Sequence, residues 1–319
     1  MATIASKVAE ITGKANPTDF PNPFPDRYHP NLKYFRLFLL DLLFISNHAK
    51  NGDHIIYASV TDPNGKILNP ETKYIRKLAE MFPDCTFDVW TMDDEFYPKS
   101  ENIKKYAKTL DEGTNEFADI PNKLLIINNI FTDTETISDQ IVSDQMIKQS
   151  DLCKIVNAKS SFLIFVLPKS GGTFDYYDGE KYLQPYSRSI FPEKNASRLV
   201  TSDYDKMTSY DILDYNKKME YHNEIYKSRP VLDRKWDTFI KRYRIHHRWN
   251  NILTLYICKR YLNIKDKIDN NSTVNDEESL ELFGELSKIF NVKKSLYNIR
   301  GRLTASNPTG KMTKQKNRK

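Results

Sequence analysis

Short apolar runs that alternate with helical patterns constrain most strongly what this chain can fold into. Apolar residues recur at helical spacing within 70–82 and 138–157, between runs typical of buried strands. Strands that are apolar on both faces and alternate with helices indicate an α/β domain with one doubly wound, mostly parallel sheet and helices on both faces. The runs are His54–Val60, Asn122–Ile130, Ser160–Leu167 and Ser197–Ser202, with an alternating run around Phe87, Val89 and Thr91.

Composition divides the chain into an arm, a domain and a tail. Residues 1–30 are rich in Pro, Asn and Asp and predict an irregular N-terminal arm. The segment 32–50 is apolar on more than one face, which predicts a helix buried in the core. No repeat or low-complexity linker interrupts residues 31–300, so we expect a single domain there, followed by a basic, disordered tail at 301–319.

Several classes of protein are disfavoured. The longest apolar run, Tyr34 to Ile45, contains Arg36 and Asp41 and is too short to span a bilayer, and the amino terminus lacks a signal-peptide pattern. We therefore expect a cytoplasmic protein with no membrane partner. The sequence contains neither Ser/His/Asp spacing nor a P-loop, which disfavours the commonest hydrolases and nucleotide triphosphatases.

The cysteines and histidines predict no metal site. The three cysteines are far apart, and the six histidines form no HExxH frame or other pattern of metal ligands. We expect the thiols to be buried and unreactive: Cys85, Cys153 and Cys258.

Positive charge concentrates toward the carboxyl end and indicates single-stranded RNA as a partner. The formal net charge is +6, and from Lys293 onward the chain carries nine Lys or Arg and no Asp or Glu. Residues 215–230 and 234–251 interleave Lys and Arg with Tyr, Trp and His, which combines phosphate neutralisation with surfaces for base stacking. Alternatively, most of these aromatic residues pack in the core, and the basic face still binds RNA. The expected RNA-binding residues are Lys217, Lys218, Lys241, Arg242, Arg244 and Arg248.

In an open α/β sheet, ligands bind at the carboxyl ends of the strands. The turn after the first strand, ASVTDPNG, takes the place of a glycine-rich cofactor loop, and its Ala58, Asp62 and Gly65 are the candidates for cofactor contact. Asp93 follows the next strand and has the chemistry to hold both hydroxyls of a ribose. A solvated acidic turn at 93–95 is the alternative.

Four motifs, in this order and spacing, carry a resemblance to a known family. They are LFLLDLLFIS (Leu37–Ser46) before HIIY, KLLIIN (Lys123–Asn128), YLQPYS (Tyr182–Ser187) and DYNKKMEYHNEIY (Asp214–Tyr226). Together they resemble the poxvirus-type poly(A) polymerase regulatory subunit, which is also the cap-specific mRNA nucleoside 2'-O-methyltransferase. The resemblance covers roughly residues 32–300 and implies a Rossmann-like methyltransferase fold that binds S-adenosylmethionine.

The family's Lys-Asp-Lys-Glu catalytic set is not retained at the matching positions. These positions hold Asn47, Asn129, Ile164 and Ala196. Asp93 matches the family's ribose-binding acid. The nearby residues that could substitute for the catalytic set are Lys50, Lys169 and Glu193.

The resemblance therefore implies a protein that keeps RNA and partner surfaces but has lost catalysis. Its expected role is to hold nascent single-stranded RNA against the catalytic subunit of a poly(A) polymerase, with S-adenosylmethionine binding lost. As a viral protein it would lie in the host cytoplasm or the virion. Two alternatives stay open: an active S-adenosylmethionine-dependent cap 2'-O-methyltransferase with Lys50 or Lys169 as base, and a structural or assembly protein.

Overall fold

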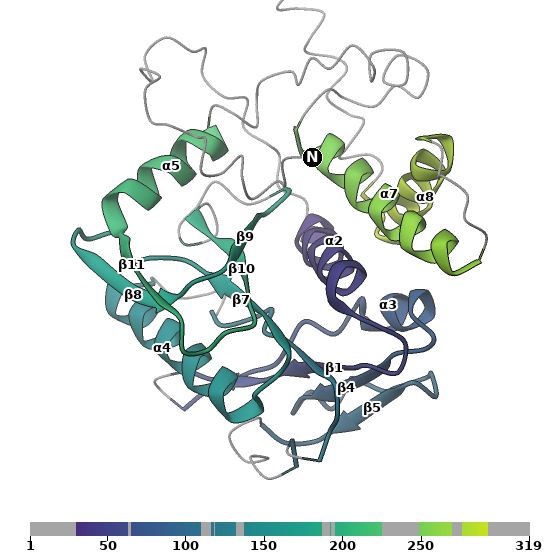
Figure 1. The fold of residues 1–319 in the computed structure, drawn as a ribbon, viewed down its shortest axis with the longest axis horizontal. Helices are drawn as coiled ribbons and strands as arrows, with labels where there is room; N and C mark the ends of the chain where they lie inside the picture. Colours follow the sequence, from purple (N-terminus) through teal and green to yellow (C-terminus); the bar gives the residue numbers. More distant parts are fainter. Residues whose placement is uncertain are drawn as a thin grey trace, which may run out of the picture.

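A seven-stranded sheet runs through the protein in the order β5-β4-β1-β6-β7-β10-β9 (Figure 1). The structure is a computed structural model that describes residues 30–62, 65–109, 116–117, 119–131, 137–186, 192, 195–224, 249–269 and 276–292. The strands of the sheet are β1 (His54–Ala58), β4 (Thr86–Trp90), β5 (Ile103–Tyr106), β6 (Lys123–Ile126), β7 (Ser160–Phe165), β9 (Glu180–Leu183) and β10 (Ser197–Thr201).

The directions of these strands define the fold. Strands β5, β4, β1, β6 and β7 are parallel, whereas β10 lies antiparallel between β7 and β9. Counted along the chain, the order within the sheet is 3-2-1-4-5-7-6 with strand 7 reversed. This is the strand order of the Rossmann-like methyltransferase fold, so the expected fold class is confirmed.

The strands form where the apolar runs predicted them. Four of the five residues of β1 and five of the six of β7 are buried, which is the pattern of strands covered on both faces. Two short pairings were not predicted: the hairpin of β2 (Val60–Thr61) with β3 (Ile67–Leu68) and the ribbon of β8 (Thr173–Tyr177) with β11 (Met207–Asp211). The edge strands β5 and β9 were not predicted either. Their sequences carry too few apolar residues to give a strand pattern.

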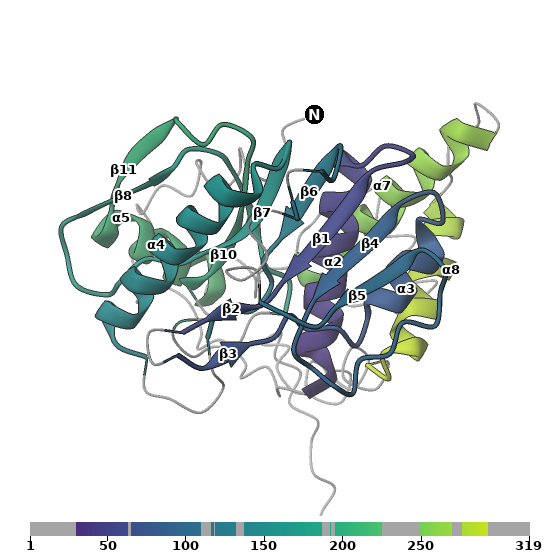
Figure 2. The same ribbon diagram turned by 90° about the horizontal axis from the view of Figure 1, so that it is seen from below.

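Helices cover both faces of the sheet (Figure 2). Helix α2 (Pro30–His48) is the predicted buried helix and contacts α3 (Ile75–Met81) and α7 (Trp249–Asp269), which packs on α8 (Asp276–Ile289). Helix α4 (Asp139–Val156) lies on the opposite face with β8, and α5 (Ile212–Glu224) follows β11. Right-handed crossovers explain why helices lie on both faces of the sheet. The connection from β1 to β4 and the connection from β6 to β7 run in opposite directions across the sheet, so their helices lie on opposite faces. No helix within the described ranges is long and apolar enough to cross a membrane.

A buried polar cluster joins α2 to the sheet. Asp41 of α2 is fully buried and its Oδ2 accepts hydrogen bonds from the hydroxyls of Tyr57 (3.0 Å) and Tyr74 (2.8 Å). The guanidinium of Arg198 on β10 is also buried, 4.0 Å from Asp41 Oδ1, and lies over the ring of Phe162. The cluster therefore fixes α2 over three strands, and each of its two charges depends on the other for compensation.

We expect Asp41→Asn and Arg198→Met each to lower the free energy of unfolding by about 3–5 kcal/mol at pH 7, because each leaves one buried charge uncompensated. The double variant should lose clearly less than the sum of the two. Urea unfolding followed by circular dichroism measures all three. A loss below about 1 kcal/mol in both single variants would show that the two charges do not depend on each other.

The same cluster gives stability a pH dependence. Burial raises the pKa of Asp41 from 3.8 to about 6, against the lowering influence of Arg198 and the two tyrosine hydroxyls. Between these two values the folded protein holds a proton that the unfolded chain has released, so the contribution of Asp41 to stability falls as pH rises from about 4 to about 6. Asp41→Asn should lack this part of the dependence when unfolding is measured across that range.

Candidate functional site

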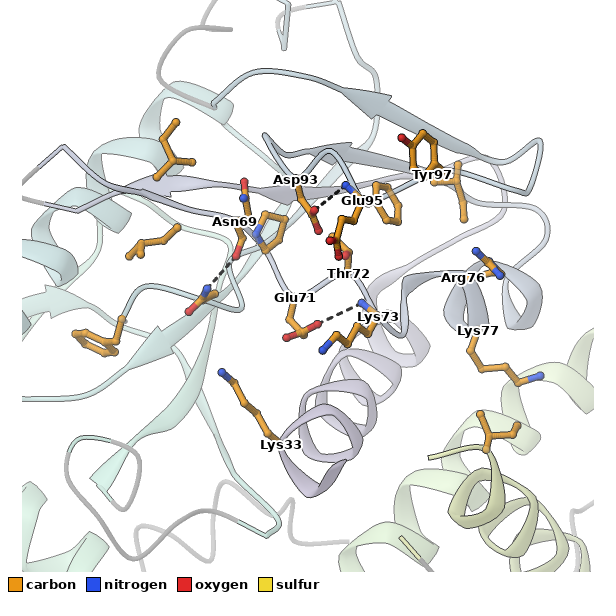
Figure 3. A pocket seen from close by; sticks show the side chains of 18 of the residues that line it. Lys33, Asn69, Glu71, Thr72, Lys73, Arg76, Lys77, Asp93, Glu95 and Tyr97 are labelled. Carbon is orange, nitrogen blue, oxygen red and sulfur yellow. Dashed lines mark hydrogen bonds between the residues drawn. The ribbon is translucent and has the colours of Figure 1, made fainter. Parts of the chain in front are cut away.

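A pocket of about 890 Å³ lies at the carboxyl edge of the sheet (Figure 3). Its walls come from the segments after β1, β4 and β6, from the first turn of α2, from α3 and from the end of α8. From β1 the chain adds β4 and β5 on one side of the sheet, and it then returns to add β6 and β7 on the other side of β1. The pocket therefore lies at the switch point between β1 and β6, where open α/β sheets bind ligands. The charged and polar residues that line it are Lys33, Lys66, Asn69, Glu71, Thr72, Lys73, Arg76, Lys77, Glu80, Asp93, Glu95 and Asn129.

The turn after β1 is a hairpin and not a phosphate-type loop. Gly65 has φ +81°, and its amide donates to the carbonyl of Asp62, whose carboxylate in turn accepts the Lys66 amide at 2.8 Å. Ala58 is buried at the end of β1. Of the four candidate cofactor residues, Asp93 lines the pocket, whereas Ala58, Asp62 and Gly65 shape the backbone that leads to it.

Two neighbouring amides at the end of β6 hold the segment 69–74 across the switch point. Asn128 is buried, and its Oδ1 accepts the Glu71 amide at 3.0 Å while its Nδ2 donates to the Tyr74 hydroxyl at 2.7 Å. Asn129 is half-buried and donates to the carbonyl of Asn69 at 2.9 Å. The Asn69 side chain in turn accepts from Ser59 Oγ and from the Met92 amide, which ties the ends of β1 and β4 to the same segment.

Asp93 is held in place by its own backbone. Its amide donates to Thr91 Oγ1, its carbonyl accepts Lys105 Nζ at 2.7 Å, and its Oδ1 accepts the Glu95 amide at 3.0 Å. Among the described residues, Oδ2 has no hydrogen-bond partner and Asp93 is half-buried in the pocket wall. The carboxylate can therefore accept a hydrogen bond from a ligand hydroxyl without rearrangement.

The pocket carries charges of both signs. Lys73 donates to the Tyr34 hydroxyl at 2.6 Å, which raises the pKa of Lys73, and its Nζ lies 4.2 Å from the centre of the Tyr34 ring. Lys77 pairs with Glu80 at 3.1 Å one turn along α3. Arg76 is exposed and has no partner among the described residues. Sequence reasoning missed these cations because 66–77 follows the first strand, where backbone amides and not side chains were expected to meet a ligand.

The positions that match the family's catalytic set come from four parts of the fold, and three of them lie on or beside the neighbouring strands β6, β7 and β10. Asn47 lies near the end of α2, about 21 Å along the helix from Lys33 at the pocket, and hydrogen-bonds Tyr182 of β9 and Arg260 of α7. Asn129 lines the pocket. Ile164 is a partly buried residue of β7, and Ala196 is buried just before β10.

The substitute residues lie at opposite edges of the sheet. Lys50 is exposed in the turn before β1 and therefore lies at the amino edge, away from Asp93. Lys169 is exposed after β7, at the carboxyl edge, and its amide donates to Asp139 Oδ1 at 2.8 Å. Glu193 lies outside the described residues.

The predicted RNA-binding residues are described only in part. Lys217 is exposed on α5, and the adjacent Lys218 pairs with Asp214 at 2.5 Å. On the same helix the aromatic Tyr215 is buried against Phe165. This aromatic residue therefore packs in the core, as the alternative interpretation expected. The remaining residues lie outside the described part of the chain: Lys241, Arg242, Arg244 and Arg248.

The cysteines are buried and free, as expected. Burial raises the pKa of Cys85 to about 11 and that of Cys153 to about 12, and it raises the pKa of Cys258 as well. Their thiolate forms are therefore suppressed at neutral pH. No group of three His, Cys, Asp or Glu among the described residues could hold a metal ion.

The strand order and the pocket at the switch point define this chain as an α/β protein with a Rossmann-like methyltransferase fold. No family model and no curated protein matches the sequence. Among solved structures, the chain is similar to VP4 of bluetongue virus, described as a multifunctional RNA-capping production line, with 12% identity and a TM-score of 0.42. The similarity covers 63% of this chain and 32% of VP4, so this chain matches about a third of VP4.

We expect Asn128→Ala to cost about 1–3 kcal/mol of stability, because it removes the acceptor of the Glu71 amide and one of the two hydrogen bonds of the buried Tyr74 hydroxyl. Hydrogen exchange should show faster exchange of the Glu71 amide in this variant. Asn129→Ala is the matched control, since it removes a single half-buried hydrogen bond and leaves the Glu71 amide bonded. Equal protection of Glu71 in wild type and Asn128→Ala would contradict the role assigned to Asn128.

Proposed function

We propose that this protein is a non-catalytic, RNA-binding subunit of a viral-type poly(A) polymerase, built on a methyltransferase fold. The observation that carries the proposal is the pair of amides at the end of β6: Asn128 and Asn129 bond the segment 69–74, at the place where the resembling family has a catalytic acid. The motif order from residues 37 to 226 supports the same family.

The chemistry of 2'-O-methyl transfer supports the loss of catalysis. Such a transfer needs a base for the ribose hydroxyl, and a lysine serves only when neighbouring groups lower its pKa. The matching positions hold two amides, an isoleucine and an alanine, none of which can accept that proton: Asn47, Asn129, Ile164 and Ala196. Lys50 lies at the opposite edge of the sheet from Asp93.

RNA binding by the basic surfaces would supply the remaining function. Lys217 is exposed on α5, within the DYNKKMEYHNEIY motif, and the chain beyond Lys293 carries only positive charge. Such side chains neutralise phosphates without reading sequence. A subunit of this kind would keep nascent RNA close to a catalytic partner, so that adenylate addition continues without dissociation.

A second candidate function is favoured by one observation. Asp93 lines a large pocket at the switch point, next to the end of β1, which is where a methyltransferase of this fold would hold the ribose of S-adenosylmethionine. In this alternative the protein is an active cap 2'-O-methyltransferase, with Lys169 as the candidate base on the same edge of the sheet.

We expect the full chain to bind a labelled single-stranded oligoadenylate of about 20 nucleotides, with an affinity that falls steeply as salt rises. Lys217→Gln should weaken binding several-fold and reduce the log–log salt slope by about 0.7, the value for one lost phosphate contact. Fluorescence anisotropy at several salt concentrations measures both. Lys154→Gln, which removes an exposed lysine from α4, is the control and should change neither quantity. An affinity that does not depend on salt would contradict the proposal.

Isothermal titration with S-adenosylmethionine and S-adenosylhomocysteine separates the two candidate functions. The non-catalytic proposal predicts no saturable binding and no methyl transfer to capped RNA. Micromolar binding together with transfer that is lost in Lys169→Ala would establish the enzymatic alternative.

A further inference from the structure

We propose that the pocket at the carboxyl edge binds a single nucleotide of single-stranded RNA, with its ribose 2'-hydroxyl on Asp93 and its phosphate on Arg76. This inference deepens the proposed function and rests on it, because it locates one part of the RNA site. It requires a hydrogen-bond acceptor, a cation and an aromatic surface within one pocket, and the structure has all three (Figure 3).

The acceptor is the free oxygen of Asp93. Three backbone and side-chain bonds fix this residue, through Thr91, Lys105 and Glu95, and leave Oδ2 without a partner among the described residues. A carboxylate oxygen accepts hydrogen bonds only, so it selects ligands that present hydroxyl or amino donors. The 2'-hydroxyl is the donor that distinguishes RNA from DNA.

The cation is Arg76, which enters the pocket from α3 (Figure 3). The neighbouring Lys77 is already paired with Glu80, whereas Arg76 is exposed and has no partner within the described chain. A guanidinium presents a planar fork that bonds two oxygens of one phosphate.

The aromatic surface is Tyr97, which follows Asp93 by four residues and is 67% exposed at the pocket wall. Its ring has a lysine ammonium, Lys105 Nζ, 5.7 Å from the centre on one side. An exposed tyrosine next to a ribose-binding acid suits base stacking, which contributes about 1–3 kcal/mol per base in single-stranded complexes.

The end of α8, which precedes the basic C-terminal segment in the sequence, lines the same pocket. Ile289 at the end of α8 lines the pocket, and Val292, three residues later, is buried and is the last described residue. The next residue is Lys293, the first of the nine cations in a segment with no acid.

The test compares ribo- and deoxyribo-pentaadenylate, each labelled and measured by anisotropy with the full chain. Wild type should prefer RNA about tenfold, the value of one charge-assisted hydrogen bond. Asp93→Asn keeps an acceptor for the Glu95 amide but replaces Oδ2 with a donor, so it should abolish this preference and leave the affinity for DNA unchanged. Arg76→Gln should weaken both ligands about tenfold and lower the salt slope by about 0.7.

Lys154→Gln is the matched control and should leave all affinities unchanged, and thermal unfolding checks that each variant folds. If wild type binds RNA but neither pocket variant changes the affinity or the preference for RNA, the inference is overturned and the proposed function stands. If no RNA binds at all, the proposed function fails with it. Saturable binding of S-adenosylmethionine that Asp93→Asn removes would overturn the inference in favour of a cofactor pocket.

Discussion

The carboxyl edge of this protein depends on the side-chain amide of Asn128. This amide bonds the backbone of Glu71 and the hydroxyl of Tyr74, and Tyr74 bonds the buried Asp41. Through these contacts the end of β6, the segment 69–74 and helix α2 form one hydrogen-bonded unit. The pocket wall and the position of Lys73 and Arg76 follow from that unit, because both residues extend the segment that Asn128 holds.

The amide also suits its place beside Asp41. A carboxylate in place of Asn128 would lie close to the buried carboxylate of Asp41, and like charges in a buried site are costly. An amide gives both a donor and an acceptor without charge. Asn128 thus bonds this edge without adding a charge to it.

The central strands of the sheet could be predicted from the sequence, because strands buried on both faces appear as continuous apolar runs. Runs such as HIIYA and SSFLIF are apolar on both faces, and in the structure they form β1 and β7 in the centre of the sheet. Edge strands are different, since β5 (IKKY) and β9 (EKYL) carry charges on their exposed faces and so resemble loops. Asp93 was found because it directly follows a strand, and a strand's end is a position that the sequence defines.

The rest of the site could not be found in this way, because its residues meet through tertiary packing. Lys33 on α2 and Arg76 on α3 line one pocket together with Ile289 on α8, which is more than two hundred positions further along the chain. The hairpin of β2 and β3 removes the glycine-type turn and moves cation side chains into the place where backbone amides were expected. A fold that usually offers backbone amides to a cofactor here offers a guanidinium donor and a carboxylate acceptor in one pocket.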